Sequence, residues 1–312
     1  MPSTNFVKLL FLFFLYFLSS IHTAFAGSQL QLQKVTDNVY AIIGPLGNRD
    51  PQNLGNNATF GFVVTSDGVV LIDSGGTYQG AAEIHALIKT VTDKPVKVVI
   101  NTGGQDHRWL GNGYFKKQGA RLIANSKAVA DQKARARDQF FMLGNLVGDA
   151  GLKNTEAVYA EETFDDSLTF KFGDTAFELH HAGPAHTPGD SFVWLPEKRV
   201  VFTGDIVYVQ RMLGVTPVSN SKSWVTTFEA MAALQPKIVV PGHGHVTTLK
   251  EATAHTYDYL VFLRQAVSEF MANGGGIENS GKLDQSQFSF LQNYDILKGR
   301  NAQRVYEELE WE

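Results

Sequence analysis

The stretch Val98-Val99-Ile100-Asn101-Thr102-Gly103-Gly104-Gln105-Asp106-His107 runs from an apolar segment directly into a polar cluster. The apolar part has no polar alternation, which favours a strand buried on both faces. Before it, a helix is predicted from about Gly80 to Val91, with apolar residues at helical spacing. An earlier apolar strand, residues 69–72, ends at Asp73. Strand, helix and strand in this order predict an α/β fold with a helix covering a sheet.

Three more polar clusters follow or lie beside predicted strands, where an α/β sheet places its ligand-binding loops. They are 183–190, which contains His186 and Asp190; 203–205, which ends at Asp205; and 241–245, which contains His243 and His245. Imidazole nitrogens and carboxylate oxygens suit zinc, iron or manganese. A lone Asp at such a place usually caps a helix or fixes a turn. Four clusters in the same topological position favour a shared site instead.

The rest of the chain continues the alternation of strands and helices. Strands are expected around Phe170 and over 177–179, 192–194, 200–202 and 237–240, and helices from about Lys127, over 223–234, around 260–270 and around 302–309. The glycine-rich segment from Gly274 through Lys282 is predicted to be a flexible connection. No charge run or long linker divides the chain, so residues 27–312 are predicted to form a single domain with C-terminal helices.

The N-terminus has the layout of a secretory signal peptide over residues 1–26. Lys8 precedes an apolar run of ten residues, and Ala24-Phe25-Ala26 is a small-x-small cleavage pattern. The alternative, a membrane anchor, requires a longer apolar run. We therefore expect a secreted, periplasmic protein with no stable membrane insertion once this segment is removed.

Composition excludes several classes of function. The net charge of −4 provides no basic surface for nucleic acid. The chain has no cysteine, so disulfides, thiolate nucleophiles and thiolate metal ligands are all excluded. Any metal must be held by His, Asp, Glu or backbone oxygen.

Taken together, the ordered motifs resemble those of the metallo-β-lactamase superfamily. The motifs are Val70-Leu71-Ile72-Asp73-Ser74-Gly75, the 101–107 loop, Gly183-x-x-His186-Thr187-x-Gly189-Asp190, Phe202-Thr203-Gly204-Asp205 and Pro241-Gly242-His243-Gly244. The resemblance implies an αββα sandwich with metals at one edge of the sheets. It is greatest to periplasmic members associated with quinoprotein oxidation systems, partly through the pattern at 300–310.

The 101–107 loop departs from the family pattern, in which His-x-His-x-Asp-His follows Asn-Thr. Gly103-Gly104-Gln105 stand where two histidines are expected, and the loop is one residue shorter. By resemblance, Asp106, His107, Asp205 and His243 form an intact half-site, whereas His186 belongs to a depleted one. The resemblance therefore implies one divalent ion per chain, most often zinc, with iron or manganese as alternatives. Gln105 and His245 are the only spare ligands nearby.

Two functions remain open from the sequence. The first is a metal-dependent hydrolase that activates water to cleave an ester, lactone, thioester or related bond in a small-molecule substrate. In it, Asp106 and His186 are the catalytic candidates, and Asp73 either orients a ligand or caps a turn. The second is an inactive periplasmic relative that binds a small molecule, a metal or a partner, such as a quinoprotein system. Trp109, Tyr208, Arg211 and Trp224 either line the pocket or belong to the core.

Overall fold

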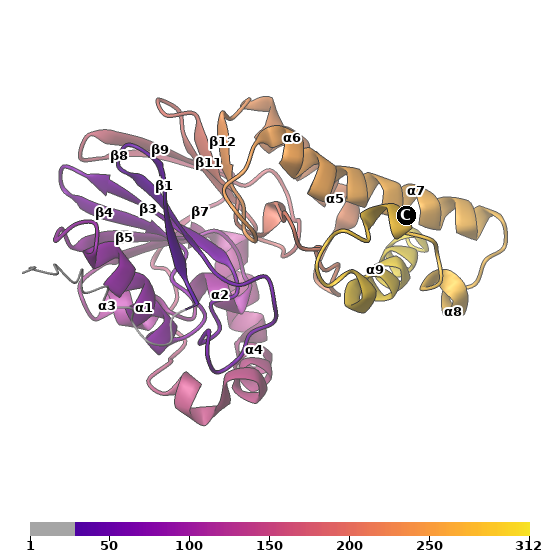
Figure 1. The fold of residues 1–312 in the computed structure, drawn as a ribbon, viewed down its shortest axis with the longest axis horizontal. Coiled ribbons are helices and arrows are strands. Elements are labelled where there is room, and N and C mark those ends of the chain that lie inside the picture. Colours follow the sequence, from indigo (N-terminus) through magenta and orange to yellow (C-terminus); the bar gives the residue numbers. More distant parts are fainter. Residues whose placement is uncertain (1–28) are drawn as a thin grey trace, which may run out of the picture.

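Two β-sheets pack face to face between layers of helices in the computed structural model, which describes residues 29–312 (Figure 1). The predicted signal peptide lies outside the described residues. Within residues 29–312, no helix combines the length and apolar character needed to cross a membrane. The αββα arrangement expected from the sequence is confirmed.

The first sheet contains seven strands in sequence order. Its first four strands are antiparallel neighbours, and the last three continue the sheet in parallel from β4. The strands are β1 (Gln31–Thr36), β2 (Val39–Ile43), β3 (Thr59–Thr65), β4 (Gly68–Ile72), β5 (Val96–Asn101), β6 (Arg121–Asn125) and β7 (Glu162–Phe164).

The second sheet has the order β12-β11-β10-β9-β8. Only its β11–β12 pair is parallel. The strands are β8 (Ser167–Phe172), β9 (Thr175–His180), β10 (Phe192–Leu195), β11 (Val200–Phe202) and β12 (Ile238–Val240). At the edge near the polar loops, the Thr59 amide of β3 donates to the carbonyl of Gly242 at 2.7 Å, which ties the two sheets together.

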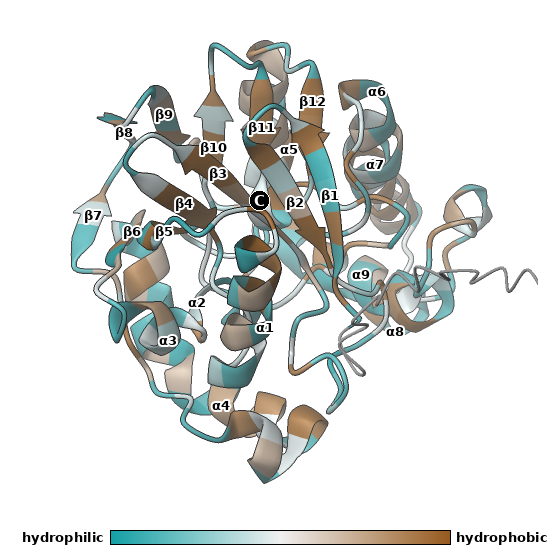
Figure 2. Cartoon of the chain, turned by 60° about the vertical axis from the view of Figure 1, so that its left-hand side comes forward, coloured by the Kyte–Doolittle hydropathy of each residue, from teal (hydrophilic) through white to brown (hydrophobic). Residues whose placement is uncertain are grey.

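The apolar strands are buried on both faces, as the sequence predicts. In β5, Val98 and Ile100 point into the core between the sheets, whereas Val99 faces the helices on the outer side. The same alternation occurs in β4, where Val70 and Ile72 face the second sheet. Figure 2 shows these hydrophobic residues, in brown, along the strands. Two buried faces explain why neither strand has polar alternation.

Helices cover the outer face of each sheet. Those of the first half are α1 (Tyr78–Lys89), α2 (Asp106–Trp109), α3 (Asn112–Lys116) and α4 (Ser126–Leu152). The predicted helix at 80–91 is α1, which begins two residues earlier because the Thr77 side chain caps it by accepting from the Gly80 amide. Those of the second half are α5 (Ser221–Ala233), α6 (Leu249–Ala252), α7 (Asp258–Ala272), α8 (Ile277–Ser280) and α9 (Tyr294–Leu309).

The C-terminal helices form a layer of their own beside the second sheet, coloured orange and yellow in Figure 1. The predicted apolar stripe of α7 is confirmed, since Leu260, Leu263 and Val267 are fully buried. The prediction of a flexible connection at 274–282 is wrong for its second half. There α8 forms, and Gly281 packs directly against the backbone of Gly299 in α9.

Candidate metal centre

The polar loops that follow β5, β11 and β12 meet at one edge of the sheets. His107 lies on the short helix α2 directly after β5, Asp205 lies in a 3₁₀ turn after β11 (Gly204–Ile206), and His243 follows β12. Because β5 and β12 belong to different sheets, only the packing of the two sheets brings these residues together. The side chains of all three are almost fully buried.

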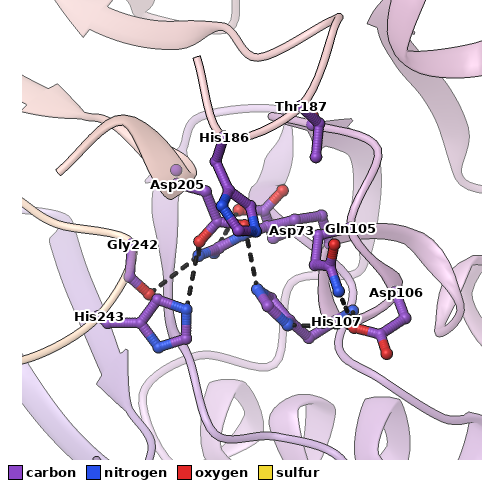
Figure 3. A network of polar contacts seen from close by, with 12 residues as sticks. Asp73, Gln105, Asp106, His107, His186, Thr187, Asp205, Gly242 and His243 are labelled. Atoms are coloured by element: carbon purple, nitrogen blue, oxygen red, sulfur yellow. Dashed lines mark hydrogen bonds and ion pairs between the residues drawn. The ribbon is translucent and has the colours of Figure 1, made fainter. Parts of the chain in front are cut away.

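His107, Asp205 and His243 offer three ligand atoms that lie within 4.8 Å of one another. The Nε2 atom of His107 is 3.2 Å from one oxygen of Asp205, and the Nε2 atom of His243 is 3.2 Å from the other. Figure 3 shows both imidazoles pointing at this carboxylate. Two ligand atoms at about 2.0–2.1 Å from one zinc ion and at the tetrahedral angle lie about 3.3 Å apart. Each imidazole lies at this distance from a different oxygen of Asp205, so the three side chains form a compact group that could hold one ion.

His243 is oriented for ligation by its other ring nitrogen. Its Nδ1 lies 2.8 Å from the carbonyl of Asn57, so Nδ1–H donates there and Nε2 keeps its lone pair. Burial and the nearby Arg211 guanidinium hold the pKa of His243 well below its usual range. The neutral imidazole, which is the form that binds metal, is therefore favoured.

His107 has two competing partners at Nδ1. Arg49 Nη2 lies 2.8 Å away, and an Asp106 oxygen lies 3.2 Å away. When Arg49 donates to Nδ1, Nε2 carries the proton and donates to Asp205. When Nδ1–H donates to Asp106, Nε2 is free for a metal. The tautomer of His107 thus depends on which of these two groups it contacts.

Asp106 does not join the group of three. Its carboxylate forms an ion pair with Arg49 at 2.5 Å and also accepts from the His107 backbone amide at 2.7 Å. Burial would raise the pKa of Asp106, but Arg49 and His107 outweigh it and lower that pKa. The structure therefore places Asp106 beside the site as an ionised partner of Arg49, while its role as a ligand stays a prediction.

Arg108 supplies the buried positive charge of the site, and no sequence pattern marks it for this role. Its fully buried guanidinium donates to both oxygens of Asp205, at 2.7 and 3.2 Å, and to Asp73 at 2.9 Å. It also donates to the carbonyls of Thr59 and Gly242. Despite the opposing effect of burial, Arg108 and His107 hold the pKa of Asp205 well below its usual range. Asp73 thus helps to fix Arg108, which in turn binds Asp205, and Asp73 hydrogen-bonds to none of the candidate ligand histidines.

His186 approaches the site from the loop before β10. In Figure 3 its ring overlaps the Asp205 carboxylate in the view, and the charge of Asp205 acts on its pKa. Its Nδ1 donates to the carbonyl of Gly214 at 3.0 Å. Burial lowers its pKa to about 4, so the ring is neutral at neutral pH and Nε2 can accept a proton or a ligand. His186 does not belong to the group of three.

The space beside the two glycines is filled by acidic side chains from other elements. A Cβ atom added to Gly103 would collide with Asp190, and one added to Gly104 would collide with Asp131 of α4. Asp190 is fully buried and accepts from the Thr187 amide at 2.8 Å. Burial, followed by the negative charge of Asp205, raises the pKa of Asp190 to about 8. This side of the site therefore holds a carboxyl group that is largely protonated at neutral pH.

Neither of the spare ligands named from the sequence joins the group of three. Gln105 Nε2 is 3.4 Å from Asp106, and His245 pairs with Glu251 at 3.1 Å. Trp109 and Trp224 are fully buried core residues. Tyr208, by contrast, contacts the site, because its hydroxyl donates to Asp205 at 3.0 Å.

Sequence reasoning missed Arg49, Arg108 and Asp190 as parts of the site. Arg49 precedes β3 by ten positions and approaches the site only through the fold. Arg108 directly follows His107, but nothing in its sequence context marks it as buried. Asp190 belongs to the 183–190 motif, but only the structure shows that it fills the space at Gly103.

The donor set fits one divalent ion. Two imidazoles and one carboxylate with an open position are a common set for catalytic zinc and for non-haem iron. Both oxygens of Asp205 are shared with Arg108, which leaves that carboxylate with less negative charge to offer a metal. Among the described residues, no second group of three His, Asp or Glu side chains comes as close together.

Comparison with known proteins identifies the family of the chain. A family model described as the metallo-beta-lactamase superfamily matches residues 55–243. The metallo-beta-lactamase type 2 of Elizabethkingia meningoseptica is 26% identical over 238 residues, which are 74% of this chain and 85% of that protein. The protein of the same name from Bacillus sp. (strain 170) is 28% identical over 200 residues, which are 63% of this chain and 70% of that protein.

A solved structure has the same fold. A metallo-beta-lactamase from Pontibacter korlensis aligns with a TM-score of 0.60 at 24% identity and covers 75% of this chain and 99% of that one. The region matched by the family model ends at His243. The helices α6 to α9 therefore lie beyond it.

Proposed function

Because the chain belongs to the metallo-β-lactamase superfamily, we propose that it is a hydrolase with one divalent ion, zinc in the first instance, that cleaves an ester, lactone, thioester or related bond. The observation that carries this proposal is the convergence of His107, Asp205 and His243 within 4.8 Å. Membership of the superfamily supports a metal-dependent hydrolase in general. The type of bond that is cleaved and the number of ions that bind are the more specific parts of the proposal.

Each residue of the site has a distinct part in this function. His107, Asp205 and His243 would hold the ion, which when bound supplies Lewis acidity and a water molecule of lowered pKa. Arg108 on α2 and Tyr208, which follows the 3₁₀ turn, both donate hydrogen bonds to the Asp205 carboxylate and fix its position. His186 presents a neutral Nε2 that can accept a proton and return it to a leaving group. Asp106 stays ionised and holds Arg49 at the edge of the site.

A cavity of about 340 Å³ beside the site provides room for a small molecule. It is lined by polar residues next to the ligands, by residues of α4 and by two apolar side chains: Asn48, Arg49, Gln105, Asp106, Arg135, Asp138, Gln139, Met142 and Leu146. The mixed lining suits a substrate with both a polar group and a carbon chain.

Metal analysis and a substrate panel test the proposal. Protein purified without added metal should contain about one divalent ion per chain. It should turn over at least one member of a panel of esters, lactones, thioesters and β-lactams, and chelation should abolish that turnover. Two tightly held ions would contradict the single-ion site, and a metal-loaded protein inert toward the whole panel would contradict the hydrolase.

One observation favours a second candidate, an inactive relative that binds a small molecule, a metal or a partner. Arg108 occupies both oxygens of Asp205, and Arg49 contacts Nδ1 of His107, so the polar groups of the site have partners without a metal. A protein that binds a ligand from the panel without converting it would support this candidate.

We also propose export to the periplasm, where a quinoprotein oxidation system is the proposed partner. The basis is the N-terminal segment and the resemblance described above. Cell fractionation with N-terminal sequencing of the mature protein tests the export, and the expected new N-terminus is Gly27. Loss of quinoprotein-dependent oxidation in a strain that lacks this protein tests the partnership.

A further inference from the structure

Beside the candidate metal centre lies a second, smaller cavity, most of whose lining falls outside the region that the family model matches. It has a volume of about 170 Å³ and is lined by two arginines, two asparagines and two apolar residues: Arg211, Arg300, Asn48, Asn293, Ile296 and Leu297. Four of the six belong to α9 or its N-terminal cap, beyond the matched region that ends at His243. Helix α9 and its cap therefore supply most of the lining of this cavity.

Hydrogen bonds join the three segments that form the cavity. The amide of Met212 donates to the carbonyl of Gln292, and the amide of Gln292 donates to the carbonyl of Gln210, which fixes Arg211 beside the start of α9. The side-chain amide of Asn293 donates to the carbonyl of Leu46 at 3.3 Å. These bonds hold α9 against the loop before β3 that also carries Arg49.

Arg211 lies at the boundary between this cavity and the candidate metal centre. Its Nη1 donates to the carbonyl of Gly47 at 3.2 Å and lies 3.4 Å from Nδ1 of His243. A group bound at Arg211 is therefore close enough to the candidate ligands to belong to the same substrate molecule.

Neither arginine of this cavity forms a direct ion pair with a carboxylate of the described residues. The other arginines near the site each have an acidic partner: Arg49 pairs with Asp106, Arg108 with Asp73 and Asp205, and Arg135 with Asp131. Within residues 29–312, no carboxylate lies within ion-pair distance of Arg211 or Arg300. The Nε–H of Arg211 is also buried without an acceptor. Burial, only partly offset by Tyr208, lowers the pKa of Arg211.

A buried N–H such as Nε–H of Arg211 costs free energy until an acceptor binds to it. The flat fork of an arginine matches the two oxygens of a carboxylate. Ile296 and Leu297 offer apolar contacts to the carbon chain next to such a group. A dianionic phosphate would match the charge as well, but it would leave this apolar wall without a partner.

We propose that the substrate carries a carboxylate that binds between Arg211 and Arg300, with its adjoining carbon chain on Ile296 and Leu297 and its scissile bond at the metal centre. This assignment of substrate class rests on the proposed hydrolase function, but binding at the cavity does not require turnover. Arg211 and Arg300 are then the residues that determine specificity for anionic substrates.

Direct binding of simple probes tests the subsite. Hexanoate, hexanamide and inorganic phosphate would be titrated calorimetrically at constant ionic strength into the protein as purified and after chelation. Hexanoate should bind more tightly than either of the other probes. Arg300→Gln and Arg211→Gln should each weaken hexanoate binding at least tenfold in both preparations.

Lys298→Gln is the matched control, because it removes the same charge from the same helix. Lys298 pairs with Asp295 and does not line the cavity. Its hexanoate affinity should stay within twofold of the wild type. If Arg211→Gln does not fold, Arg300→Gln still tests the proposal, because Arg300 is exposed. Equal binding of hexanamide, tighter binding of phosphate, or unchanged hexanoate binding in Arg300→Gln would each overturn the proposal.

A kinetic test follows once a hydrolysed ester is identified. Arg300→Gln should raise KM at least fivefold for a monoester of a dicarboxylic acid and leave kcat within twofold. The KM for the corresponding neutral diester should stay within twofold. An inert protein that still binds hexanoate through Arg300 would refute the proposed hydrolase, whereas an active hydrolase that does not bind hexanoate would refute the subsite alone.

Discussion

The two sides of the metal centre differ in what fills them. On the side of β11 and β12, Asp205 and His243 meet His107 in a group of ligand atoms that lie within 4.8 Å of one another. On the side of the 101–107 loop, Gly103 and Gly104 carry no side chain, and Asp190 and Asp131 fill the adjacent space. A glycine in place of a large residue normally leaves a cavity. Here, Asp190 from the loop before β10 and Asp131 from α4 occupy the space.

The two sides also differ in how their charges are balanced. The side with the candidate ligands has an ionised Asp205, neutralised by the buried Arg108. The glycine side has a carboxyl group, Asp190, that burial keeps largely protonated. Two acidic residues near each other thus differ in protonation because only one has an arginine partner.

The largest effect is expected from removing Arg108. Arg108→Met would leave Asp73 and Asp205 buried without their counter-ion and should lower the free energy of unfolding by about 3–5 kcal/mol. Denaturant unfolding monitored by circular dichroism measures this. Arg108→Lys keeps the charge but not the fork, so its loss should be smaller. A loss below about 1 kcal/mol for Arg108→Met would show that the pair is not essential to the fold.

The next largest effect concerns metal binding and separates the two candidate histidine roles. His107→Ala should weaken metal affinity at least 100-fold, or about 3 kcal/mol, because it removes one of three ligands. His186→Ala should keep about one ion per chain while turnover falls, because His186 lies outside the group of three. Elemental analysis and a competition titration with a chelating dye measure both. If His186→Ala binds no metal, His186 is itself a ligand, and the division into a metal-binding side and a glycine side is wrong.

Restoring a histidine on the glycine side should destabilise the protein. Gly103→His forces a ring into the space of Asp190 and should cost about 1–3 kcal/mol of unfolding free energy through overpacking. The double variant with Asp190→Gly should recover at least half of that loss, since the two sites share one volume. Gly47→His is the control, because a Cβ there meets open space. An equal loss in both glycine variants would mean that Asp190 is not the cause.

The layers of the fold and most of the site could be predicted from the sequence because both depend on local patterns. Continuous apolar strands such as Val98 to Ile100 indicate burial on both faces, and the Asp and His residues that follow them meet at one edge. The sequence did not predict Arg108 as a buried counter-ion, because its burial depends on four segments that meet only after folding. Asp106 was expected among the ligands, yet the structure pairs it with Arg49, which lies 57 positions earlier in the chain.

The smallest expected effect is a pH dependence that comes from Asp190. Its folded-state pKa is raised to about 8, so the native protein keeps a proton that the unfolded chain has already lost above about pH 4. The unfolded state then binds fewer protons, and stability decreases as the pH rises toward 8, by about 1 kcal/mol per pH unit. Asp190→Asn should remove this contribution, so its unfolding free energy relative to wild type should rise steadily between pH 5 and pH 8. Asp149→Asn, at an exposed position on α4, should follow the wild type throughout. Parallel stability curves for wild type and Asp190→Asn would mean that Asp190 is ionised in the native protein and that the two sides of the site do not differ in protonation.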